Sequence, residues 1–254
     1  MRFSVVDFLN ARPLTWGLLR EPPPGVEVSR DLPSACADKL ASGEADVGLI
    51  PSIEYQRIPG LRVVPGLGIA ASSEVRSVLL VSKVSREKIR SVALDPGSRT
   101  SAALTRILLD RRYGVRPSFV EGIGENTDAR LVIGDPALKA RLTGHVVLDL
   151  AAEWRAFTGQ SFVFAFWAVR DGVDGMEAER IVRESRDRGR DRFNDLVHEE
   201  SAETGLAEAV VEDYLRHSLH FDLDRGDLGG LELFYRLAAD QGLIAQARPL
   251  VFVS

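Results

Sequence analysis

The sequence predicts an α/β protein built as two lobes with a ligand cleft between them. Short apolar runs typical of strands alternate with amphipathic stretches typical of helices along most of the chain. Two apolar strands, at residues 75–82 and 162–170, enclose a block that has an alternation of its own. A chain that leaves one lobe, builds another and returns crosses between them twice. We therefore expect lobe 1 to comprise residues 1–82 and 167–254, and lobe 2 to comprise residues 83–166.

The elements of lobe 1 follow from its apolar pattern and from the positions of proline and glycine. Residues 2–7 predict a strand, and Pro13 suits the first turn of the helix that follows. Proline is tolerated there because the N–H that it lacks has no helical partner in any case. Gly43 is expected to end the second helix. The other predicted elements are strands at 26–32, 45–50, 61–65 and 75–81, and helices at 34–42 and from residue 51.

Lobe 2 shows the same alternation and is followed by a mostly helical C-terminal part. The run at residues 162–169 is aromatic and continuously apolar, which predicts a strand buried on both faces. Turn residues at 95–98 precede an amphipathic helix at 100–112. The other predicted elements are strands at 89–94, 118–121, 129–133 and 145–148, helices at 136–142 and 151–157, and C-terminal helices at 177–201, 204–218 and 227–241.

Composition and charge limit the classes of function. The formal net charge of −5 argues against nucleic acid as a partner, because such binding requires a basic surface. The single cysteine, Cys36, excludes an intrachain disulfide and indicates a reducing compartment. No signal peptide is apparent, and no apolar run approaches the roughly 18 residues that span a bilayer. We therefore expect a cytoplasmic protein without a membrane partner, and the sequence leaves its oligomeric state open.

Four predicted strand-to-helix joints carry polar side chains that suit a small anion. Helix N-termini offer unpaired N–H groups and the positive end of the helix dipole, and ligands of open α/β sheets gather at the carboxyl ends of the strands. The residues concerned are Asn10, Arg12, Ser52, Ser98, Thr100, Ser101 and Asp135. Each joint alone is explained more simply by ordinary capping, and Asp135 is expected to be the N-cap of a helix that Pro136 begins. The hydroxyl cluster at 98–101 is richer than a cap requires, so we favour ligand contact there.

Other candidate residues carry less weight. His217 and His220 are expected three positions apart on one helix, but no third ligand stands at a fitting spacing, so we predict no metal site. Cys36 has no histidine near it in the sequence, which disfavours a thiol nucleophile. The nucleophile elbow, Walker loop and dinucleotide-binding glycine motifs are all absent from the sequence.

Five separated motifs resemble, in order, those of the MqnA family, the chorismate dehydratases of the futalosine route to menaquinone. The first resembles the family signature YLNARPL and consists of Phe8-Leu9-Asn10-Ala11-Arg12-Pro13-Leu14. The others lie at residues 40–51, 75–82, 133–138 and 153–167. Phe8 departs from the family, which commonly has tyrosine there, and this removes a hydroxyl group. The C-terminal helical part fits the family only loosely.

The resemblance implies a fold like that of the type II periplasmic binding proteins, used here as an enzyme. It implies a carbon–oxygen hydro-lyase that removes water from chorismate to give 3-[(1-carboxyvinyl)oxy]benzoate, without a metal or an organic cofactor. Chorismate carries two carboxylates, so two facing anion sites suit it. From their positions we assign catalytic roles to Asn10 and Ser77. Substrate contacts are assigned to Arg12, Ser52, Ser98, Thr100, Ser101 and Asp135.

The general base of this reaction has two candidates. The proton to be removed lies on the ether-bearing ring carbon, and donors on the ring carboxylate would stabilise the charge that develops there. Asp135 is one candidate. The other, which we favour, is the substrate's own enolpyruvyl carboxylate, held by Asn10 and the hydroxyls. Two other functions stay open: a non-catalytic small-anion-binding protein of the same fold, and the related 1,4-dihydroxy-6-naphthoate synthase, whose N-terminal pattern lacks Asn-Ala-Arg-Pro.

Overall fold

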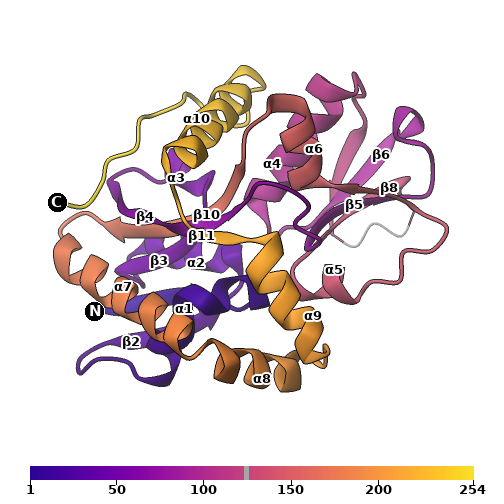
Figure 1. Ribbon diagram of the computed structural model, residues 1–254. Helices are drawn as coiled ribbons and strands as arrows, with labels where there is room; N and C mark the ends of the chain where they lie inside the picture. The colour runs from indigo at the N-terminus through magenta and orange to yellow at the C-terminus, as the bar shows by residue number, and fades with distance from the viewer. Residues whose placement is uncertain (123–125) are drawn as a thin grey trace.

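Two β-sheets with helices around them form the protein, as the computed structural model describes it for residues 1–122 and 126–254 (Figure 1). The larger sheet has six strands in the order β11-β4-β10-β3-β1-β2. Its strands are β1 (Arg2–Val6), β2 (Glu27–Asp31), β3 (Val47–Pro51), β4 (Leu61–Ala71), β10 (Phe162–Arg170) and β11 (His220–Asp222). Strand β10 lies between β3 and β4, antiparallel to both, and every residue of it except the last is buried. This confirms the prediction of a strand covered on both faces.

The smaller sheet has five strands in the order β7-β6-β8-β5-β9. Its strands are β5 (Val78–Ser82), β6 (Ser91–Leu94), β7 (Ser118–Glu121), β8 (Ala129–Ile133) and β9 (Val146–Asp149). Strand β5 is antiparallel to β8 and β9, whereas β6 is parallel to β7 and β8. The predicted strands in this block are thus all present, with ends that differ by a few residues.

The expected lobe boundaries need correcting by one strand at each crossing. Residues 78–82 were expected in lobe 1, but as β5 they pair within the smaller sheet. Residues 162–166 were expected in lobe 2, but they begin β10 of the larger sheet. The apolar pattern identifies both strands and is silent on their hydrogen-bonding partners. We therefore propose 1–71 with 162–254 as lobe 1, 78–158 as lobe 2, and crossings at 72–77 and 159–161.

Helices cover both sheets and connect most of the strands (Figure 1). Those before β10 are the 3-10 turns Leu9–Ala11 and Arg86–Lys88, α1 (Arg12–Arg20), α2 (Pro33–Ser42), α3 (Glu54–Arg57), α4 (Arg99–Ile107) with a π-helical turn at Leu108–Arg112, α5 (Asp135–Lys139) and α6 (Leu150–Thr158). Those after β10 are α7 (Gly175–Asp191), α8 (Phe193–Thr204), α9 (Glu208–Asp213) with a π-helical turn at Tyr214–Ser218, and α10 (Arg225–Asp240). No helix within the described residues is both long and apolar enough to cross a membrane.

The C-terminal part differs from the prediction in two ways. A single helix was expected over 177–201, but Arg192 leaves the helical conformation (φ −107°, ψ 29°) and separates α7 from α8. Between the last two helices the chain extends as β11, which pairs with β4. His217 and His220 therefore lie on different elements, and each contacts an aspartate, Asp213 and Asp227 respectively.

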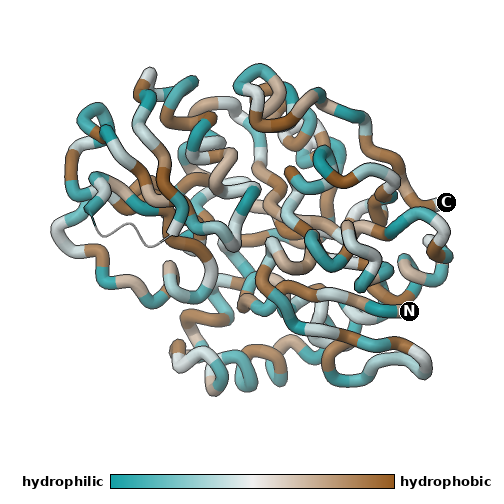
Figure 2. Tube along the Cα trace, turned by 180° about the vertical axis from the view of Figure 1, so that it is seen from behind, coloured by the Kyte–Doolittle hydropathy of each residue, from teal (hydrophilic) through white to brown (hydrophobic). Residues whose placement is uncertain are grey.

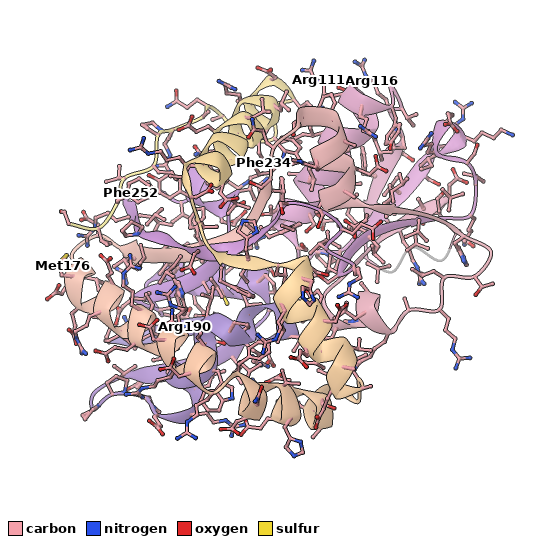
Figure 3. All side chains as sticks on the ribbon, in the orientation of Figure 1. Arg111, Arg116, Met176, Arg190, Phe234 and Phe252 are labelled. Atoms are coloured by element: carbon pink, nitrogen blue, oxygen red, sulfur yellow. The ribbon has the colours of Figure 1, made fainter. Side chains whose placement is uncertain are left out.

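One hydrophobic cluster runs through both lobes. Hydrophilic and hydrophobic residues mix along the outer helices, as expected for elements with one buried side (Figure 2). The rings of Trp154, Phe162 and Phe234 meet edge to face at 5.0–6.3 Å and join α6, β10 and α10. Phe234 lies inside this cluster, whereas Met176 and Phe252 project from the surface (Figure 3). These aromatic contacts thus pack α6 of lobe 2 against β10 and α10 of lobe 1.

Candidate functional site

A cavity lies between the lobes, and its non-atom space of about 470 Å³ includes the solvent at its open side. Lobe 1 contributes Val6, Phe8, Asn10, Pro33, Pro51, Ile69, Phe164 and Ala165, and lobe 2 contributes Val78, Ser98, Thr100, Ser101, Ile133 and Gly134. The cavity therefore brings together Asn10 and three of the hydroxyl residues that the sequence singled out.

Asn10 supplies the polar group on the lobe 1 side. It lies in the 3-10 turn that connects β1 to α1, and this turn aims the side chain at the cavity. Its Oδ1 is buried and has no hydrogen-bond partner within the described part of the chain. Buried polar atoms are nearly always paired, so an orphan at a cavity wall points to a ligand. The amide offers both N–H and C=O groups, so it can donate to a carboxylate.

Three hydroxyl residues at the start of α4 supply the polar groups on the lobe 2 side. Ser98 Oγ donates to Ser101 Oγ at 2.7 Å, and Thr100 Oγ1 accepts the Ile53 N–H at 3.2 Å. Ser98 occupies the N-cap position, but its side chain makes no capping hydrogen bond. Ordinary capping therefore does not account for these hydroxyls. Together with the first N–H groups of α4, which have no partner within the helix itself, they form a surface that favours an anion.

The remaining walls of the cavity are apolar and suit a flat ring. Phe8 and Phe164 contribute aromatic rings, and Val78 and Ile133 contribute branched aliphatic side chains. Gly134 has a positive φ of 64°, and a Cβ placed there would lie 2.9 Å from the Phe8 ring. Glycine is needed at this point because it both adopts that backbone conformation and lets Phe8 approach from the other lobe.

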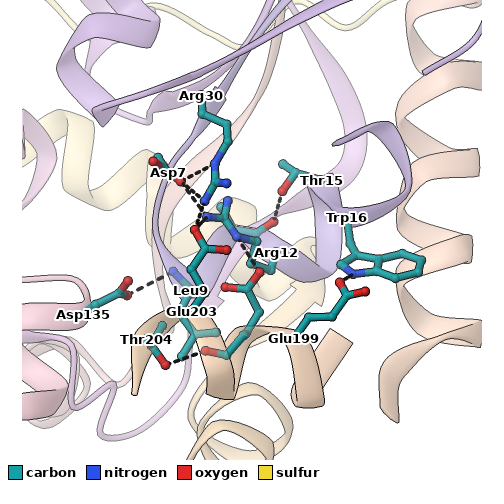
Figure 4. A network of polar contacts seen from close by, with 12 residues as sticks. Asp7, Leu9, Arg12, Thr15, Trp16, Arg30, Asp135, Glu199, Glu203 and Thr204 are labelled. Atoms are coloured by element: carbon teal, nitrogen blue, oxygen red, sulfur yellow. Dashed lines mark hydrogen bonds and ion pairs between the residues drawn. The ribbon is translucent and has the colours of Figure 1, made fainter. Parts of the chain in front are cut away.

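Arg12 points away from the cavity, contrary to the expectation from its position beside Asn10. Its guanidinium is buried, with Nε 2.9 Å from Glu200 Oε1 and one terminal nitrogen 2.6 Å from Asp7 Oδ1 (Figure 4). Asp7 also pairs with Arg30, which extends the network toward the surface. A buried guanidinium requires such partners, and Glu200 lies far along the chain, so the local pattern could not reveal it. Arg12 fixes the start of α1 to α8 and lines no part of the cavity.

Ser52 and Ser77 are fully buried immediately behind the wall. Ser52 Oγ donates to the Val163 carbonyl at 2.8 Å and lies 3.5 Å from Thr100 Oγ1. Ser77 Oγ accepts the Tyr214 hydroxyl proton at 2.6 Å, and the Ser77 carbonyl accepts the Gly134 N–H at 2.8 Å. Each serine therefore neighbours a residue of the wall, Pro51 or Val78, and is not itself part of it.

Asp135 connects the two lobes instead of capping its helix. The N-cap position belongs to Gly134, and the Asp135 side chain makes no capping contact. Its Oδ1 accepts the Leu9 N–H of lobe 1 at 3.0 Å (Figure 4). Burial raises the pKa of the Asp135 carboxyl above its usual value. The cavity-lining residue of this joint is the preceding Gly134.

Two residues near the site escaped the sequence analysis, and both come from the C-terminal helices. Glu200 is buried beside Arg12, and Tyr214 is fully buried against Ser77. Burial raises the pKa of the Tyr214 hydroxyl, which keeps it a hydrogen-bond donor. Both residues belong to charged, amphipathic helices, and the neighbouring sequence does not indicate which distant residues they contact.

The structure offers little for metal or thiol chemistry. Within residues 1–122 and 126–254, no three His, Cys, Asp or Glu side chains group closely enough to bind a metal ion. Cys36 is buried, and this burial raises the pKa of its thiol to about 12, which leaves it unreactive at neutral pH.

Two lobes, each with its own sheet, and a cavity between them define a protein of the periplasmic-binding-protein-like fold. Solved structures show the same fold. The chain is 17% identical to AF1704 from Archaeoglobus fulgidus, with 96% of this chain and 98% of that chain covered and a TM-score of 0.78. The aliphatic sulphonate binding protein SsuA from Escherichia coli is 16% identical, with 100% and 94% covered and a TM-score of 0.66.

The family is shown by the sequence comparisons. A family model described as menaquinone biosynthesis matches residues 1–240, and the chain belongs to this family. It is 29% identical to a chorismate dehydratase from Thermus thermophilus over 89% of this chain and 91% of that protein. It is 33% identical to a chorismate dehydratase from Campylobacter jejuni over 65% of this chain and 66% of that protein.

Proposed function

We propose that this protein is a chorismate dehydratase, a carbon–oxygen lyase that converts chorismate to 3-[(1-carboxyvinyl)oxy]benzoate in menaquinone biosynthesis. The observation that carries the proposal is the cavity itself, which is lined by the Asn10 amide of one lobe, the hydroxyls of Ser98, Thr100 and Ser101 of the other lobe, and apolar side chains. Such a site suits a flat ring that carries two carboxylates. The names of the two curated relatives support the same activity.

In this proposal the start of α4 binds the ring carboxylate. Removal of the proton from the ether-bearing carbon drives negative charge through the conjugated ring into that carboxylate. Hydroxyl and N–H donors fixed at the helix start would stabilise the charge as it develops. The bond from the ring to the neighbouring hydroxyl then breaks, its oxygen takes up the removed proton and leaves as water, and the ring becomes aromatic. Lowering the barrier to proton removal is therefore the main task of the protein.

We further propose that the substrate's enolpyruvyl carboxylate takes the proton while Asn10 orients it. In support, the described residues that line the cavity include no carboxylate, imidazole or amine. Asp135, the other candidate base, is engaged by the Leu9 N–H. Orientation of two groups within one molecule can lower a barrier by about 7–11 kcal/mol at best. Arg12, Ser52 and Ser77 would then support the walls of the cavity from behind.

The second candidate function is binding of a small anion without chemistry, which also fits the lack of a titratable group among the described residues that line the cavity. Incubation of the purified protein with chorismate, followed by chromatography with ultraviolet detection, separates the two. A dehydratase yields a new aromatic product in proportion to enzyme and time. A binder leaves only the slow background decay of chorismate, and that result would refute the proposed activity.

We also propose a cytoplasmic, reducing setting. The lone Cys36 is buried and unreactive, which fits a compartment where disulfides do not form.

A further inference from the structure

Two hydrogen bonds between the lobes flank the cavity, and both join a backbone N–H of lobe 1 to a side-chain oxygen of lobe 2. The Leu9 N–H donates to Asp135 Oδ1 at 3.0 Å, and the Ile53 N–H donates to Thr100 Oγ1 at 3.2 Å. Thr100 also lines the cavity, whereas Asp135 does not. The contact of Asp135 can therefore be altered without changing a side chain that faces the ligand.

We propose that Asp135 is a positioning residue that holds the turn bearing Asn10 against lobe 2 and so keeps the cavity closed around its ligand. Its carboxylate works through one acceptor oxygen and does not remove the substrate proton. The kinetic test of this inference rests on the proposed function, because it measures turnover of chorismate. Amide hydrogen exchange tests the inference without turnover.

The need for an acceptor at Leu9 follows from the local backbone. Leu9 is the first residue of the 3-10 turn Leu9–Ala11, and the first N–H groups of a helical segment have no partner within it. The preceding residue, Phe8, offers no side-chain cap, and Leu9 is fully buried. Without Asp135, a buried N–H next to Asn10 would lose its partner, which is an unfavourable arrangement.

The strand-to-helix joint of lobe 2 that contains Asp135 also contacts the side chain of Phe8, the residue that precedes Leu9. The Phe8 ring rests on Gly134, where a Cβ would approach it to 2.9 Å. Gly134 and Asp135 thus hold two consecutive residues, Phe8 and Leu9, that lead directly into Asn10. A small displacement of this joint would carry the Asn10 amide with it.

The charge of Asp135 is not essential to this role. The charged groups that act on it are Arg12 and Lys139, which favour the carboxylate, and Asp7, which opposes it. Burial is the largest influence and favours the neutral acid. Either form presents an oxygen that can accept the Leu9 N–H, and so does the amide of asparagine. This separates a positioning role from that of a base, which only a carboxylate can fill.

The kinetic test compares Asp135→Asn with Asp135→Ala. Asparagine keeps the acceptor oxygen, so we expect kcat and KM for chorismate within about threefold of wild type. Alanine removes it, so we expect KM to rise about tenfold, with a smaller change in kcat because bound substrate still favours closure. Glu87→Ala, at an exposed carboxylate of lobe 2, is the matched control. Equal loss of kcat in both Asp135 variants, with KM unchanged, would overturn the inference and identify Asp135 as the base.

Amide hydrogen exchange of the ligand-free protein tests the contact directly. In Asp135→Ala, exchange of the Leu9 amide should accelerate about tenfold, whereas Asp135→Asn should leave it near wild type. The Gly134 amide, bonded to the Ser77 carbonyl at 2.8 Å, reports whether the joint itself has unfolded. An unchanged Leu9 rate in the alanine variant would refute the positioning role, whatever the protein does with chorismate. A failure to convert chorismate would instead refute only the proposed activity.

Discussion

The two lobes line the cavity with two similar segments, Asn10-Ala11-Arg12 of lobe 1 and residues 98–101 of lobe 2. In each segment, the short polar side chains line the cavity, whereas the arginine does not line it and forms ion pairs instead. The partners of the two arginines differ. Arg12, whose side chain is 4% exposed, binds the exposed Asp7 and the buried Glu200, both of lobe 1. Arg99, whose side chain is 31% exposed, binds the exposed Asp38 and the buried Glu54, so it joins lobe 2 to lobe 1. Arg12 thus fixes one wall within its lobe, and Arg99 fixes one lobe to the other.

Asn10→Asp should cause the largest loss of activity among the variants considered. It would set a carboxylate against the substrate carboxylate that we propose Asn10 holds. We expect chorismate turnover to fall about 100-fold or more, as when an oriented donor is lost from other active sites. The variant should still be folded at the assay temperature by circular dichroism, with a lowered unfolding midpoint, because the new carboxylate is buried and Asn10 Oδ1 has no protein partner among the described residues. Near-normal turnover in this variant would contradict the assigned role.

Arg12→Met should cause the largest loss of stability. It leaves the buried Glu200 without its partner, and breaking one side of a buried ion pair costs about 3–5 kcal/mol. Urea unfolding followed by circular dichroism measures this free energy. The double variant Arg12→Met/Glu200→Gln should recover part of the loss, because no uncompensated charge remains. If the single variant unfolds like wild type, Arg12 does not anchor the wall.

Arg99→Met should cost much less, because one partner, Asp38, is largely exposed and the other, Glu54, keeps its contact with Arg57. The exposed pair with Asp38 contributes about 0–1 kcal/mol, and the buried Glu54 carboxylate is still compensated by Arg57. We expect a small change in the urea midpoint together with a few-fold weaker affinity for chorismate by calorimetry, since the lobes lose one connection. Stability as low as that of Arg12→Met would show that the two arginines are equivalent, contrary to the comparison.

Acidification should affect the Arg12 side through Asp7. Burial works to raise the pKa of Asp7, but hydrogen bonds from Arg12 and Arg30 outweigh it and hold that pKa below its usual value. The stabilisation is therefore present above the ordinary pKa of about 4 and is lost as pH falls through the lower folded value. We expect less than about 1 kcal/mol, because Asp7 is partly exposed. In Asp7→Asn, the free energy of unfolding should depend less on pH below about pH 4. An unchanged pH dependence in that range would contradict the ion pairs of Asp7 with Arg12 and Arg30.

The sequence predicted the parts of the cavity that depend on local pattern. Asn10 and the hydroxyls at 98, 100 and 101 reach it because strand-to-helix joints gather at the carboxyl ends of strands. Arg12, Ser52, Ser77 and Asp135 occupy similar joints but are committed to Glu200, Val163, Tyr214 and Leu9. Those partners lie far along the chain, so no local pattern could identify them. The predicted lobe boundaries differ from the observed sheets for a related reason. The local apolar pattern shows that β5 and β10 are strands, but only their pairing with distant strands shows to which sheet each belongs.

The position of β10 between β3 and β4 has a consequence for the order in which the protein can fold as it is synthesised. When the ribosome has added residue 149, every strand of the smaller sheet has been made. The larger sheet still lacks the strand that joins its two halves, although its first four strands were made earlier. We expect the inserted lobe to be the first to mature, while apolar edges of β3 and β4 wait for β10 and are exposed to aggregation in the interval.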